Sequence, residues 1–156
     1  MKIRAILCAA LASAMLATGA MAQDMIRAQD PSTVTGFMFD EGIPTKTDVD
    51  NVGDPVVMFR KGDHPYVIMF YDCVENRECK SLRFYSGFET NGKVDVAFAN
   101  MLNNENRFAT ALIDDEDDLV LIMDVLTGDN GLTTKDFKNL LDLFIALIDD
   151  ARTQMN

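Results

Sequence analysis

The stretch PVVMFRKGDHPYVIMFYDCVENRECKSLRFYSGF, residues 55–88, decides the fold of this protein. It contains three runs, over 55–61, 65–72 and 80–88, that are rich in Val, Ile, Phe and Tyr, the residues that favour β-strands. A Gly-Asp turn joins the first two runs, and a short polar segment precedes the third. Because short connections join antiparallel strands, these residues predict an antiparallel meander.

The segments on either side of this meander predict two helices and three further strands. Ser32 is the expected N-cap of the first helix. The elements, read from hydrophobic periodicity, are a helix over 32–42, an edge strand over 43–50, a helix over 94–101 and a hairpin of strands over 107–113 and 119–123. With a last helix, the expected order is α-β-β-β-β-α-β-β-α, an α+β domain with an antiparallel sheet and flanking helices.

The last helix carries the strongest periodic signal in the sequence. Its N-cap is expected at Thr133 or Thr134, and apolar residues recur at helical spacing over 137–151. Leu143 and Leu147 belong to a flank that widens the apolar arc to about 200°. Such an arc predicts either deep burial against the sheet or a flank left for a partner, most simply a second copy, with these two leucines at the interface.

Residues 1–22 have the three parts of a secretory signal peptide. Lys2 and Arg4 precede an apolar run rich in Ala and Leu, and an Ala-x-Ala site predicts cleavage after Ala22. The run is too short to span a membrane. We therefore expect an exported, periplasmic protein that does not associate with a membrane after cleavage.

Signal cleavage leaves a polar segment, 23–31, which we expect to be a flexible lead-in to a single domain over 32–152. Only two cysteines of the chain then remain, Cys73 and Cys79. An even number of cysteines in an oxidising compartment predicts a disulfide, and the polar residues between them favour a turn. The alternatives are a redox pair or two free thiols.

Composition restricts the function further. The chain has 25 Asp+Glu against 14 Lys+Arg, a formal net charge of −11, and removing the two cations of the signal peptide makes it −13. This surplus disfavours nucleic-acid binding, which needs clustered cations. One His and no Trp leave little material for a Ser-His-Asp triad or a zinc site, so we expect no enzyme, no metal and no cofactor. His64 is expected to be a turn residue, and an unrecognised hydrolase is kept as an alternative.

Five consecutive acids, Asp114–Asp118, occupy the turn of the second hairpin. Consecutive carboxylates can hold Ca²⁺, but this run lacks the spacing and the central Gly of an EF-hand loop. A solvated turn is the simpler interpretation. A small-ligand or cation sensor that uses the turn 114–118 is the alternative function.

Three motifs resemble the YbjN-type domain of bacteria. They are a Cys-x-Ser-Leu-x-Phe strand, an Asn-x-Leu-Asn segment followed by Arg-Phe, and a Gly-Leu-Thr helix start. In the second motif Leu102 stands where the family shows Trp. The motif residues are Ser81, Leu82, Phe84, Asn100, Leu102, Asn103, Arg107, Phe108, Gly131 and Thr133.

The resemblance covers nearly all of the mature chain and implies a fold similar to type III secretion chaperones, with frequent dimerisation. It also implies the label of sensory transduction regulator, and it brings no catalytic residues. Together with the composition, it predicts a non-enzymatic exported module for protein interaction or regulation. The expected partner is a protein of unknown identity, and a homodimer is one expected form.

Overall fold

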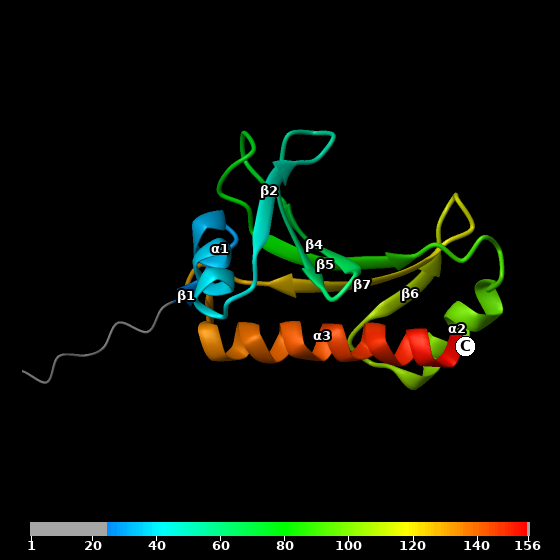
Figure 1. Cartoon of the computed structure of the whole chain (residues 1–156). Coiled ribbons are helices and arrows are strands. Elements are labelled where there is room, and N and C mark those ends of the chain that lie inside the picture. The colour runs from blue at the N-terminus through cyan, green and yellow to red at the C-terminus, as the bar shows by residue number, and fades with distance from the viewer. Residues whose placement is uncertain (1–24, 156) are drawn as a thin grey trace, which may run out of the picture.

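The computed structural model describes residues 25–155 (Figure 1). The signal peptide expected over 1–22 therefore lies outside the described residues. The helices are α1 (Pro31–Asp40), α2 (Val96–Glu105) and α3 (Thr134–Met155). The strands are β1 (Met25–Ile26), β2 (Thr45–Val49), β3 (Pro55–Lys61), β4 (His64–Tyr71), β5 (Ser81–Phe88), β6 (Thr110–Ile113), β7 (Leu119–Leu126) and β8 (Leu132–Thr133). None of these helices is long and apolar enough to cross a membrane.

Six strands form one antiparallel sheet in the order β2-β3-β4-β5-β7-β6. Consecutive strands from β2 to β5 pair with one another, which confirms the predicted meander. The chain then passes through α2 to the edge of the sheet, so β7 lies between β5 and β6. The α+β class is confirmed, and the predicted order differs only by β1 and β8, which pair as a small second sheet.

The hydrophobic core lies between one face of the sheet and the helices. Helix α3 runs along this face, with α1 and α2 near its two ends (Figure 1). Phe84 of β5 lies between Phe137 and Phe144 of α3, with ring centroids 5.6 and 5.7 Å away, and Phe37 of α1 meets Phe137 edge-on at 5.0 Å. Burial against the sheet thus accounts for the centre of the wide apolar arc of α3.

Residues 25–30 pack against the domain, in contrast to the flexible lead-in expected over 23–31. Ile26 and Ala28 are 1% and 0% exposed, and the Ala28 N–H donates to Thr127 Oγ1 at 3.2 Å. Asp30, not Ser32, caps α1, because its Oδ1 accepts the Ser32 N–H at 3.0 Å. Strands of two residues, such as β1 and β8, are too short to show a periodic pattern, so the sequence could not reveal that they pair.

Strand β7 continues to Leu126, three residues beyond the strand expected over 119–123. Asp124 ends the apolar run in the sequence, but on the sheet it lies opposite Arg83 of β5. The two side chains form an ion pair, which lets a charged residue continue the strand. Helix α2 begins later than expected, at Val96, because Asp95 caps it by accepting the Phe98 N–H.

Candidate interaction surface

The face of the sheet opposite α3 has no described helix over it (Figure 1). Strand register places Met58, Val67, Tyr85 and Ile122 in one row across β3, β4, β5 and β7, and all four are half-buried. We define the outer face as this row together with its half-buried apolar neighbour Met69; Val56 and Val120 lie on the same side of the sheet but are only 7% and 2% exposed. A contiguous apolar patch of this kind is typical of an interaction surface.

One ion pair lies beside this apolar row. The Arg83 guanidinium donates to both carboxylate oxygens of Asp124 at 2.7 and 2.8 Å, and its Cζ lies 5.0 Å from the centre of the Tyr71 ring. The hydrogen bond to Asp124 raises the pKa of Arg83, and the same bond lowers the pKa of Asp124 below its usual value. The two charges cancel, so this part of the outer face is electrically neutral.

A shallow hollow of about 440 Å³ adjoins the row, and we call it the Met58 hollow. Its walls include the apolar side chains of Pro44, Met58 and Val67. Arg60 and Lys46 also line it, and Lys46 is ion-paired with Asp48 at 3.2 Å. The outer face therefore combines an apolar row with a recess that a partner's side chain can enter.

Sequence reasoning missed this surface. An antiparallel sheet with one solvated face should alternate apolar and polar residues, but β4 reads His-Pro-Tyr-Val-Ile-Met-Phe-Tyr, apolar on both faces. Tyr66, Ile68 and Phe70 are buried in the core, and Val67 and Met69 lie on the outer face. The lack of alternation between apolar and polar residues in β4 is the sequence signal for a second apolar face, but by itself it also fits simple strand propensity.

Two of the family motifs have direct structural roles. Leu82, Phe84 and Leu102 are buried in the core, so Leu102 fills a packing role where the family shows Trp. Ser81 Oγ donates to Asp72 Oδ2 at 2.9 Å. Asn103 bonds to both backbone groups of Ala111 on the edge strand β6.

The remaining motif residues lie at the ends of elements. The Gly131 backbone has a φ of +81°, and a Cβ there would lie 2.6 Å from the Ile26 carbonyl oxygen. Thr133 caps α3: its Oγ1 accepts the Asp136 N–H at 3.0 Å and donates to the Asp136 carboxylate at 2.8 Å.

The other residues of the second motif are exposed. Phe108 is 54% exposed, with the Arg107 guanidinium 5.2 Å from its ring centre. Asn100 is exposed on α2.

The flank of α3 singled out in the sequence is half-buried. Leu143 and Leu147 both pack against the edge of the hydrophobic core, while keeping part of their surface open. Their neighbours at the centre of the stripe, Phe144 and Ile148, are 1% and 0% exposed. The two leucines therefore already contribute to packing within the chain, and an interface there stays a prediction.

The acids of 114–118 are used in part as turn residues. Asp114 Oδ1 accepts the N–H groups of Glu116 and Asp118 at 2.9 and 3.0 Å, and Asp118 Oδ1 accepts the Thr90 N–H at 2.8 Å. Local bonds of this kind stabilise a tight connection. Among residues 25–155, no three carboxylate, thiol or imidazole groups gather as a metal would require.

His64 and Ser86 lie together, although the sequence suggested that His64 was a turn residue. His64 begins β4, and its Nε2 lies 2.7 Å from Ser86 Oγ. Ser86 Oγ donates its own hydrogen to the Pro65 carbonyl oxygen at 2.8 Å, so the imidazole N–H donates to the serine. A general base must instead accept the proton of its nucleophile. The pair is arranged as a structural contact within the sheet.

A disulfide joins Cys73 and Cys79, as the cysteine count predicted. Cys79 is fully buried, and the loop between the two cysteines folds back on itself through paired backbone bonds between Val74 and Arg77. Four residues in and beside this loop have positive φ: Asp72, Glu75, Asn76 and Glu78. The crosslink holds this sharply bent connection between β4 and β5.

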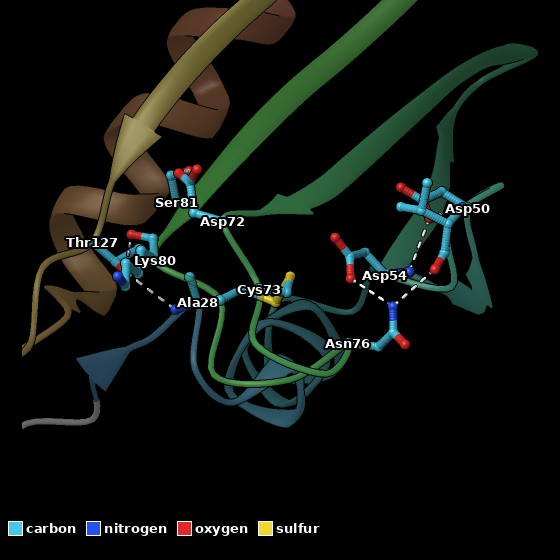
Figure 2. Close-up of a disulfide and its surroundings, with 11 residues drawn as sticks. Ala28, Asp50, Asp54, Asp72, Cys73, Asn76, Lys80, Ser81 and Thr127 are labelled. Carbon is cyan, nitrogen blue, oxygen red and sulfur yellow. Dashed lines mark hydrogen bonds between the residues drawn. A yellow bond between two sulfur atoms is a disulfide. The ribbon is translucent and has the colours of Figure 1, made fainter.

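Hydrogen bonds tie the disulfide loop to two other parts of the chain (Figure 2). Asn76 Nδ2 donates to the Val52 carbonyl oxygen and to Asp54 Oδ1, both at 2.9 Å, which fixes the turn between β2 and β3. On the other side, Thr127 Oγ1 accepts the Ala28 N–H and lies 3.5 Å from the Lys80 carbonyl oxygen. The disulfide loop and the residue after it, Lys80, thereby lie next to the turn between β2 and β3, the segment before α1 and the end of β7.

Comparison with protein families gives a match that covers all of the described chain except its first five residues. The model of the YbjN family, described as "Putative bacterial sensory transduction regulator", matches residues 30–156. The comparison with curated proteins gave no match. The matched range runs from the N-cap of α1 through α3 and includes every motif residue named above. The resemblance seen in the sequence is confirmed, and a regulatory or interaction role fits the family description: this chain belongs to the YbjN family.

Proposed function

We propose that this protein is an exported, non-enzymatic interaction module that binds a partner protein through its outer face. The observation that carries the proposal is the row Met58, Val67, Tyr85 and Ile122, which is apolar across four strands and has no described helix over it. Four strands about 4.8 Å apart and about 25 Å long give a projected area of roughly 500 Å². That area approaches the roughly 800 Å² per partner of a standard protein interface.

Charge favours a partner other than a second copy on this face. The chain has a formal net charge of −11, so two copies that approach each other repel. The outer face itself is neutral around Arg83 and Asp124, and Lys46 and Arg60 border the Met58 hollow. A neutral or basic protein with an exposed apolar patch fits this surface, because the net negative charge of the whole chain does not repel the first and attracts the second.

Export is supported by the signal-peptide pattern of residues 1–22 and by the disulfide between Cys73 and Cys79, since disulfides persist in oxidising compartments. The test is N-terminal sequencing of the protein from the periplasmic fraction. We expect the mature chain to begin at Gln23. A protein that retains Met1 and stays with the cytoplasmic fraction would contradict export.

Photo-crosslinking in intact cells tests the interaction surface. A photoreactive amino acid is placed at Val67, in the apolar row, and at Lys135, an exposed position at the start of α3, as the matched control. We expect an adduct to a second protein from position 67 and none from position 135. The partner identified should then bind the purified protein, and Val67→Glu should weaken that binding about tenfold, which corresponds to about 1.4 kcal/mol.

Three results would contradict the proposal. They are adducts of equal yield from both positions, adducts only between copies of this chain, and unchanged affinity of the identified partner for a folded Val67→Glu variant. The role of charge is checked by salt, because binding to a basic partner should weaken as ionic strength rises. Affinity that does not change with salt would exclude the basic partner.

A further inference from the structure

A second hollow lies at one end of the sheet, and we call it the Lys93 hollow. It is formed where the β3–β4 hairpin, the segment between β5 and α2, and the last turn of α3 meet, and Lys93 and Met155 line it from the last two of these. Its volume is about 620 Å³, which falls within the roughly 300–1,000 Å³ of sites that bind small molecules.

Two cations of this hollow form no ion pair with a carboxylate of residues 25–155. Arg60 comes from β3 and Lys93 from the segment after β5, and neither forms an ion pair with a described residue. Lys61, Arg83 and Lys138 do form such pairs. The Arg60 guanidinium donates to the backbone carbonyl oxygen of Asp63, which is a hydrogen bond and not an ion pair. In a chain where acids outnumber bases by 25 to 14, two cations without an ion pair that line one recess suit the carboxylate of a ligand.

The same hollow also carries groups that suit a ligand cation. Asp63 and Glu89 line it, and both are exposed carboxylates without a cation partner among the described residues. His64 lines it as well, and because its Nε2–H donates to Ser86, a neutral imidazole has Nδ1 left as an acceptor. The two cations and the two carboxylates balance, so the hollow favours a ligand that carries both charges.

Apart from Thr90, the rest of the lining is apolar. Phe88, Val94 and Met155 contribute to the walls, and the Phe88 ring lies 4.7 Å from the His64 ring. Gly87 also lines the hollow. A ligand with an aliphatic or aromatic side chain can bury it against this wall.

We propose that the Lys93 hollow binds a small zwitterion with an apolar side chain, of the class of a free α-amino acid. The ligand carboxylate lies between Arg60 and Lys93, and its ammonium group is stabilised by the carboxylates of Asp63 and Glu89. The apolar side chain packs on Phe88 and Met155. This site contains no residue of the apolar row, although Arg60 and Pro65 also line the Met58 hollow, and its ligand-binding test does not depend on the interaction function.

Calorimetric titration of the full mature protein with matched probes tests the site. The probes are L-leucine, 4-methylpentanoate, which lacks the ammonium group, and isoamylamine, which lacks the carboxylate. We expect L-leucine to bind and each analogue to bind at least about tenfold more weakly, because each loses one charged contact. No heat of binding with L-leucine at about 10 mM, or equal affinity for all three probes, would overturn the proposal.

A matched pair of variants locates the binding. Lys93→Gln removes a cation that lines this hollow, and Arg77→Gln removes an exposed cation in the disulfide loop at another part of the sheet. We expect Lys93→Gln to weaken L-leucine binding about tenfold and Arg77→Gln to leave it unchanged. Both should melt within about 2 °C of the parent, as surface substitutions usually do. Equal affinity of a folded Lys93→Gln variant would overturn the assignment to this hollow.

Discussion

Asn103, in the last turn of α2, closes the open edge of β6 by bonding to both backbone groups of Ala111. Its Nδ2 donates to the Ala111 carbonyl oxygen at 2.9 Å, and its Oδ1 accepts the Ala111 N–H at 2.7 Å. β6 is the outermost strand of the sheet, so these groups would otherwise form an unpaired edge. The side-chain amide reproduces the two bonds that a further strand would make.

Replacing Asn103 by Ala should lower the free energy of unfolding by about 1–2 kcal/mol, because two hydrogen bonds are lost. The freed edge should also promote self-association at high protein concentration. Urea denaturation measures the first effect, and light scattering over a concentration series measures the second. Asn100→Ala is the control, since Asn100 belongs to the same motif but is exposed, with no side-chain bond to a described residue. Equal losses in the two variants would contradict the role given to Asn103.

Gly131→Ala should destabilise the protein by about 2–4 kcal/mol, because the added methyl group meets the β1 backbone in a left-handed conformation. The Cβ would lie 2.6 Å from the Ile26 carbonyl oxygen, at a φ of +81°. Gly128→Ala is the matched control: its φ is +61° and no atom lies within 4 Å, so only about 1 kcal/mol is expected. Thermal unfolding of both variants checks the difference. Similar melting temperatures would show that the contact with β1 is unimportant.

Removing the disulfide by a joint change, Cys73→Ser and Cys79→Ser, should cost about 2–2.5 kcal/mol in the chain-entropy estimate for a loop this short. A reducing agent should lower the melting temperature of the parent protein and leave that of the double variant unchanged. If the two thiols are free in periplasmic material, alkylation under denaturing, non-reducing conditions will label both and refute the crosslink.

His64 should make the protein less stable in mild acid. Burial lowers its pKa, aided by Arg152 and Arg60 and opposed by Asp149. Because the folded-state pKa lies below the unfolded value of 6.5, the unfolded state binds protons first, and the free energy of unfolding falls as the pH decreases below 6.5. His64→Gln keeps an N–H donor for Ser86 and should flatten this dependence. Denaturant unfolding from pH 7.5 to 5 measures the free energy of unfolding of the parent protein and of His64→Gln. If this free energy falls equally with pH in both proteins, His64 is not the cause of the pH dependence.

The homodimer hypothesis for the flank of α3 makes its own prediction. Size exclusion with light scattering should detect a dimer at high micromolar concentration, and Leu143→Glu or Leu147→Glu should give a folded monomer. A strict monomer in the parent protein would remove the hypothesis. Loss of the helical circular dichroism signal in the variants would instead assign both leucines to the core, in keeping with their half-buried position.

Local patterns were enough to predict most elements of the fold. The runs of 55–61, 65–72 and 80–88 correspond to β3, β4 and β5, and the stripe of 137–151 lies within α3. Period-2 and period-3.6 patterns are properties of neighbouring residues, so one chain segment is enough to show them. The family motifs, too, are short runs of neighbouring residues, so they need no knowledge of contacts between distant segments.

The charge, the paired cysteines, the meander and the wide stripe of α3 were determined by the sequence alone. Only the tertiary structure decided that β1 packs on β8, that Asp124 meets Arg83, and that Asn103 closes the edge of β6. It also placed one apolar row on a face without a helix and gathered Arg60 and Lys93 at one hollow. These relationships join residues far apart in the chain or depend on which side of the sheet the helices cover, and local periodicity holds no information on either.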